Sequence, residues 1–124
     1  HRDISPISPL YFYTSSLHLP DICQVPLDAL HIETDAPWCG VKRTHAGHAH
    51  TTPLAWPEAK KPAKWEAGHV VKDRCEPCHI VHVLQVVNAA RGGATGDAAA
   101  VQAAEAEVAA AAYENSVRLF QLGK

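Results

Sequence analysis

The sequence has 124 residues, which is enough for one small domain or for a piece of a larger one. Hydrophobic residues make up 47% and charged residues 19%, so the composition excludes a disordered acidic or basic tail. The net charge of −2, with nine histidines counted as neutral, gives no bulk attraction for nucleic acid. No apolar run approaches the ~20 residues that span a bilayer, so we expect no membrane segment. The chain starts with His1 and lacks a signal-like apolar core, which favours an intracellular protein, in the nucleus or the cytoplasm.

The first third of the chain contains one clear element. Residues 1–25 show no sustained helical or strand period, and prolines divide their short apolar pieces, so we expect an irregular segment. Residues 29–34 form a short run between Pro26 and Pro37. This run predicts a buried strand that ends at Asp35.

Residues 36–76 are polar and rich in proline and glycine, which predicts a long loop. Between Lys42 and Arg74 there are seven Lys or Arg residues and three acidic ones, a local balance of +4, with Trp56 and Trp65 among them. Basic side chains with interleaved aromatics are typical of a surface that binds phosphates and stacks bases. A solvated loop that two tryptophans anchor to a core would have the same composition. The basic residues closest to the tryptophans are Lys60, Lys61 and Lys64.

A helix is predicted to begin at Pro77, because proline suits the first helical position, where its missing N–H leaves no bond unmade. Apolar side chains then recur at the i, i+3, i+4, i+7 spacing of one helix face. These residues are Ile80, Val83, Leu84 and Val87. Gly92 and Gly93 mark the end of this helix.

A second helix is predicted to begin after Asp97, a good N-cap residue, and to end near Leu122. Its alanine-rich first half has high helix propensity but little apolar bulk. We therefore expect a few larger side chains to anchor it. These are Val101, Val108, Tyr113, Val117 and Phe120.

The run Cys75-Glu76-Pro77-Cys78-His79 matches the pattern of c-type haem attachment. The same thiols and imidazole could instead form a zinc site with a fourth ligand from the preceding loop. Candidates for that ligand are Cys39, His45, His48 and His50. In a third interpretation Cys75 and Cys78 are ordinary thiols beside a helix start, since cysteine behaves as a small hydrophobe.

Three runs carry a resemblance to a known family. They are Glu33-Thr34-Asp35-Ala36-Pro37-Trp38, then Lys64-Trp65-Glu66-Ala67-Gly68-His69, and finally Arg74-Cys75-Glu76-Pro77. In this order and at this spacing they resemble the C-terminal part of the TatD-like metal-dependent deoxyribonucleases, most of all the eukaryotic branch. Cys75 stands where that family usually has Asn, so the haem-like pattern is explained as one substitution beside a cysteine that the eukaryotic branch often carries.

The resemblance implies an α/β fold, the C-terminal portion of a (β/α)8 TIM-type barrel. This portion would hold one barrel strand, a long loop and two C-terminal helices. It covers residues 26–124, and residues 1–25 form a non-matching segment. A whole barrel takes about 250 residues, so we expect a truncated barrel with an uncovered apolar helix face.

The resemblance also implies a metal-dependent phosphodiester hydrolase, a deoxyribonuclease that removes nucleotides from an end of DNA. Asp35 would be a ligand for divalent metal ions of the Mg²⁺ or Zn²⁺ type and the base that orients or deprotonates water. Arg74, and with less support Lys42, would bind substrate phosphate or brace the loops, and Glu76 would cap the following helix. The family's other metal ligands have no counterpart here, so we expect this chain to be inactive alone. The alternative function is a zinc- or haem-binding module built on Cys75, Cys78 and His79.

Overall fold

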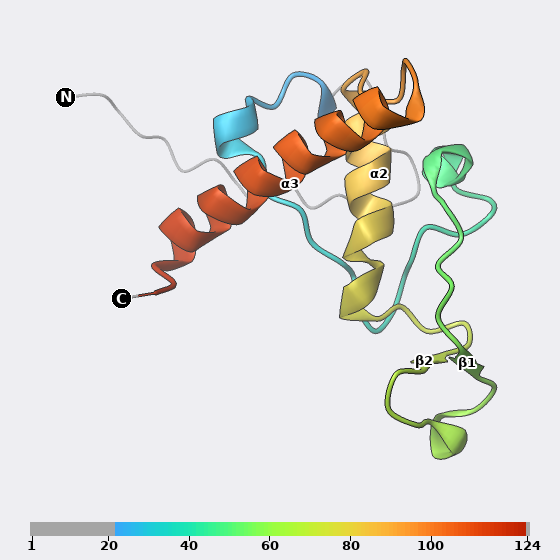
Figure 1. The fold of residues 1–124 in the computed structure, drawn as a ribbon. Coiled ribbons are helices and arrows are strands. Elements are labelled where there is room, and N and C mark those ends of the chain that lie inside the picture. The colour runs from blue at the N-terminus through green and yellow to red at the C-terminus, as the bar shows by residue number, and fades with distance from the viewer. Residues whose placement is uncertain (1–21, 124) are drawn as a thin grey trace.

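Two helices and a long, mostly irregular segment make up the structure, a computed structural model that describes residues 22–123. Helix α2 spans Ile80–Ala90 and helix α3 spans Ala98–Phe120. Figure 1 shows α3 crossing near the C-terminal end of α2, with two short strands beyond the N-terminal end of α2. The strands are β1 (Glu58–Ala59) and β2 (Val70–Val71). Four 3₁₀ turns complete the elements: η1 (Leu27–Ala29), η2 (Ala46–His50), η3 (Pro62–Lys64) and η4 (Pro77–His79).

Helix α2 confirms the first predicted helix. Pro77 opens the η4 turn that leads directly into it, and Gly92 and Gly93 follow its C-terminal end. Asn88, only 2% exposed, closes that end: its Nδ2 donates to the Gly93 carbonyl at 3.2 Å, and the Gly93 N–H donates to the Asn88 carbonyl at 2.9 Å. A Cβ at position 93 would collide with the Asn88 side chain, so glycine is required there.

Helix α3 confirms the second predicted helix, and Asp97 caps it by accepting a hydrogen bond from the Ala100 N–H at 2.9 Å. Two of its expected anchors are wrong, because Tyr113 and Phe120 are 71% and 66% exposed. The buried stripe follows the i, i+4, i+7 spacing from Val108 and excludes them. Its members are Val108, Ala112 and Asn115.

The core forms where the two helices meet residues 22–32. Four buried side chains make its centre: Ile22, Leu30, Val87 and Val108. Ile22 and partly buried Val25 precede the predicted boundary at residue 26 and nevertheless pack in this core. Residues 1–21 of the predicted irregular segment lie outside the described residues.

Polar bonds from the helices hold the segment that leads to Asp35. Asn115, buried on α3, donates from Nδ2 to the carbonyls of Leu27 and Leu30, both at 2.9 Å. Arg118 donates from Nη2 to the Asp28 carbonyl and to Asn115 Oδ1, each at 2.8 Å. Because a buried carbonyl without a donor costs free energy, Asn115 stabilises this path of the backbone.

The strand predicted over residues 29–34 is not formed. Ala29 belongs to η1, and residues 30–34 carry no ladder hydrogen bonds, although Leu30 has extended backbone angles. A strand needs a hydrogen-bonded neighbour, and no segment within residues 22–123 pairs with this one. Only an isolated antiparallel bridge joins Asp35 to Cys39.

The predicted long loop is confirmed for most of residues 36–76, with one addition. Strands β1 and β2 pair in parallel, Glu58 opposite Val70 and Ala59 opposite Val71. Strands of two residues are too short to show an alternating pattern, so they could not be predicted from the sequence. In the described part of the chain, no helix is long and apolar enough to cross a membrane.

The expected uncovered apolar helix face is present. An open groove of about 350 Å³ runs between α2 and α3, and its lining is almost entirely apolar. Its walls include Ile32, Leu84, Ala112 and Tyr113. The last turn of α3 adds exposed Leu119 and Phe120.

Replacing Asn115 with alanine should lower the free energy of unfolding by roughly 1–3 kcal/mol, because the buried Leu30 carbonyl loses its donor and the Leu27 carbonyl keeps only the bond from the Leu30 N–H. Urea denaturation followed by circular dichroism measures this change. Glu114→Ala, an exposed position on the same helix, is the matched control and should change stability far less. Equal losses in the two variants would contradict the role assigned to Asn115.

Candidate active site

The turn at Asp35 presents a free carboxylate. The Asp35 carbonyl accepts hydrogen bonds from the Trp38 N–H at 2.7 Å and the Cys39 N–H at 3.2 Å, and the Ala36–Pro37 peptide within the turn is cis. The Asp35 side chain is exposed and makes no hydrogen bond or ion pair with another residue in the range 22–123. Its lone pairs are therefore available to water, a cation or a substrate proton.

The Asp35 turn lies beside Cys75, which is forty positions later in the sequence and five residues before α2. A Cβ built on Gly40 would lie 3.8 Å from the Cys75 Sγ, so the turn and the thiol pack closely. Burial raises the pKa of the Cys75 thiol, and the negative charge of Asp35 raises it further. The structure thus brings Asp35 into electrostatic range of the residue that follows Arg74.

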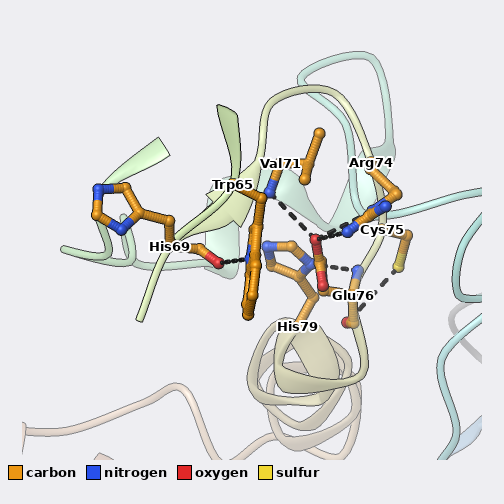
Figure 2. Close-up of polar contacts among 7 residues, drawn as sticks. All are labelled: Trp65, His69, Val71, Arg74, Cys75, Glu76 and His79. Atoms are coloured by element: carbon orange, nitrogen blue, oxygen red, sulfur yellow. Dashed lines mark hydrogen bonds and ion pairs between the residues drawn. The ribbon is translucent and has the colours of Figure 1, made fainter. Parts of the chain in front are cut away.

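Glu76 connects three parts of this region (Figure 2). Its Oε1 accepts from Arg74 Nε at 3.0 Å, from Arg74 Nη2 at 2.8 Å and from the Val71 N–H of β2 at 3.1 Å. The hydrogen bond from Arg74, followed by the bond from Val71, lowers the pKa of the Glu76 carboxyl. One carboxylate therefore joins β2 and the Arg74 side chain to the N-cap of η4.

His79 completes the junction from the helix side. Its Nδ1 accepts the Glu76 N–H at 2.8 Å, which requires a ring without a proton on Nδ1. Burial, and then the charge of His82, lower the pKa of the His79 imidazole, which favours that neutral form. The ring centroids of Trp56 and His82 lie 6.0 Å and 5.9 Å from that of His79.

Thr52 anchors the middle of the long loop to α2. Gln85 accepts the Thr52 N–H on Oε1 at 3.0 Å and donates from Nε2 to Thr52 Oγ1 at 2.8 Å. His82 Nε2 lies 3.0 Å from the Thr52 carbonyl, so this nitrogen carries the proton. A Cβ on Gly47 would lie 2.6 Å from Val86 Cγ1, so only glycine lets η2 approach α2 this closely.

The predicted site residues are only partly brought together. Asp35 lies within electrostatic range of Cys75, the residue after Arg74, and Glu76 is the N-cap of η4, as expected. The guanidinium of Arg74 is paired with Glu76, while Lys42 is exposed and makes no polar contact with Asp35 within the described residues. Sequence reasoning missed the bond from Val71 to Glu76, which no local spacing reveals.

The alternative cysteine centre has no support in the structure. Within residues 22–123 no group of three or more His, Cys, Asp or Glu side chains is placed to hold a metal ion. Cys75 is buried, Cys78 is exposed, and the Nδ1 of His79 is used by the Glu76 amide. Asp35 suits a hard cation as one oxygen ligand, but the described residues do not supply the rest of a coordination shell.

The ion pair at Glu76 predicts a pH dependence of stability. Because its pKa is lowered from the ordinary 4.5, the pair contributes fully above that pH and is lost as pH falls through the lower, folded-state value. Glu76→Gln should cost about 1 kcal/mol at pH 7, and the cost should shrink as the pH falls through the lowered pKa of the folded state, where the carboxyl takes up a proton.

Urea denaturation at pH 7, 5, 4 and 3 tests this expectation. Glu66→Gln, an exposed acid in the preceding loop, is the control and should leave the slope of stability against pH unchanged. A parallel pair of curves for the parent chain and Glu76→Gln would contradict the assignment.

Comparison with known proteins finds relatives of this chain in sequence and in fold. No family model matches the chain. It is 39% identical over 66 residues to deoxyribonuclease Tat-D of Schizosaccharomyces pombe, which is 52% of this chain and 21% of that protein. It is 34% identical over 85 residues to deoxyribonuclease Tat-D of Saccharomyces cerevisiae, which is 57% of this chain and 20% of that protein.

The fold comparison agrees with the sequence comparison. The crystal structure of a TatD-family hydrolase from Entamoeba histolytica superposes with a TM-score of 0.60 and 27% identity, covering 82% of this chain and 30% of that one. The chain spans about a fifth of the length of the curated relatives it matches. The resemblance inferred from the motifs is confirmed: in sequence and in fold, this chain resembles part of a TatD-type deoxyribonuclease.

Proposed function

We propose that this chain supplies part of the active site of a metal-dependent phosphodiester hydrolase that acts on an end of DNA. The observation that carries the proposal is the exposed Asp35 carboxylate, which no described residue engages and which a turn holds beside the start of α2. The relatives named deoxyribonuclease support the same reaction class. An exposed carboxylate in a turn, with no side-chain partner, is available as a ligand for a hard cation.

Asp35 acts in this proposal as a ligand to a divalent ion, of the Mg²⁺ or Zn²⁺ type, and as the group that orients or deprotonates the attacking water. A bound metal ion would polarise the phosphate and acidify water. Arg74 would bind the substrate phosphate. Its guanidinium has five N–H groups, and Glu76 uses only those on Nε and Nη2, so the others remain available as donors. Lys42, exposed seven residues after Asp35, adds a mobile positive charge.

We further propose that residues 26–124 form the C-terminal portion of a (β/α)8 barrel. The superposition on a TatD-family hydrolase supports this architecture, and the open apolar groove between α2 and α3 provides a face on which further elements could pack. In the completed barrel, residues 30–34 would gain the strand neighbour that they lack here. Asp35 would then lie at the carboxyl end of a strand, where active sites of such barrels are found.

A chimera tests the role of Asp35. We expect a version of the S. pombe relative whose matching segment is replaced by this chain's residues to hydrolyse DNA with added metal. Asp35→Asn should then lower kcat by roughly 100-fold or more, because a metal ligand and base is lost. Asp28→Asn, the same substitution at an exposed site, should leave the rate unchanged. Equal rates for the chimera and its two variants would show that Asp35 is not part of the active site.

The 124-residue chain by itself should hydrolyse nothing. A hard cation needs about six ligands, and one carboxylate fixes neither the ion nor the phosphate. We expect no release of nucleotides from single- or double-stranded DNA above a blank, with Mg²⁺, Mn²⁺ or Zn²⁺ present. Cleavage that Asp35→Asn abolishes would show that the chain completes its own metal site.

A further inference from the structure

We propose that the segment from β1 to β2, residues 58–71, is a binding surface for unpaired DNA, which we call the β1–β2 loop. The inference rests on the proposed function only in taking DNA as the ligand. It adds a surface that lies outside the Asp35 turn and engages single strands through charge and base stacking. Figure 1 shows this loop beyond the N-terminal end of α2, away from the packed helices.

Three lysines give the loop its attraction for phosphate. Lys60, Lys61 and Lys64 fall within five positions, all are exposed, and none forms an ion pair with a described residue. Glu58 and Glu66 flank this group, but neither forms an ion pair with these lysines. Ammonium groups that are free of intramolecular partners can replace the counterions of a nucleic-acid backbone.

Trp65 gives the loop a face for a base. The indole is 52% exposed, yet it is not free to rotate, because its Nε1–H donates to the His69 carbonyl at 2.6 Å. Figure 2 shows this bond at the edge of the ring. A hydrogen bond at the edge fixes the plane and leaves the π-surface for stacking, so less side-chain entropy is lost when a base binds.

The ends of the loop are held together. The Val70 N–H donates to the Pro57 carbonyl and the Lys72 N–H to the Ala59 carbonyl, both at 3.0 Å. The Val71 N–H bonds to Glu76 Oε1, which ties the closed loop to the start of α2. These bonds fix the ends of the loop that carries the lysines and Trp65, so the surface is formed before DNA binds.

Binding of a fluorescently labelled 12-nucleotide oligo-dT to the full 124-residue chain tests the proposal. Anisotropy is recorded in EDTA at several salt concentrations, so hydrolysis plays no part. Changing Lys60, Lys61 and Lys64 together to glutamine should weaken binding and reduce the slope of log K against log salt by about 2, at roughly 0.7 per phosphate contact. Trp65→Ala should weaken binding by about 5- to 150-fold with little change in slope.

Two control variants separate these effects from general ones. Arg43→Gln removes a positive charge from another exposed position, and Tyr113→Ala removes an exposed ring from α3. Both should bind as the parent chain does, and circular dichroism should show equal helix content in all variants. Losses in the controls that equal those in the loop variants would overturn the proposal.

A duplex of the same length distinguishes stacking from charge alone. We expect the single strand to bind more tightly, because paired bases cannot stack on Trp65. Equal or tighter duplex binding, or no effect of the loop variants, would contradict the proposal. If the loop variants lose binding while Asp35→Asn leaves hydrolysis intact in the chimera, the proposed function fails and the DNA surface stands.

Discussion

The carboxylate of Glu76 is the contact on which the arrangement of the site depends. It accepts the Val71 amide and two nitrogens of Arg74, while the Glu76 amide is bound by His79 at the start of α2. A loop of more than thirty residues has few apolar contacts of its own, so its position depends on polar junctions with α2, and this one holds the part that contains β1 and β2. Through Glu76 the β1–β2 loop is joined to the start of α2, and Cys75 next to it packs against Gly40, which follows the Asp35 turn.

Local signals in the sequence were enough for the helices. The spacing of Ile80 and Leu84, the cap at Asp97 and the glycines after α2 act within one or two turns, and the structure follows them. Contacts between distant residues could not be predicted in this way. Nothing in the sequence distinguishes Asn115 from an ordinary polar residue of a helix, yet its side chain donates hydrogen bonds to two carbonyls more than eighty positions earlier. Tyr113 was expected to be buried because its side chain is large, and it is exposed. The size of a side chain alone does not show which face of a helix is buried.

The site itself was predictable in part, for a related reason. The motif singled out Asp35 as a candidate ligand, and the structure shows that residue exposed in a turn. The strand expected before it did not form, because extended backbone becomes a strand only beside a neighbour. The chain matches about a fifth of the length of its curated relatives, and its described residues include an exposed apolar groove and an Asp35 carboxylate without a side-chain partner.

Amide hydrogen exchange, measured by NMR on the chain at neutral pH, tests the central role of Glu76 most directly. The Val71 N–H is bonded to a side chain rather than to a strand partner, so its protection reports on that single acceptor. The account predicts a protected Val71 amide that exchanges much faster in Glu76→Ala, which removes the acceptor, while the Val87 amide inside α2 keeps its protection. A Val71 amide that exchanges as fast as the open loop in the parent chain, or that is unaffected by the substitution, would contradict it.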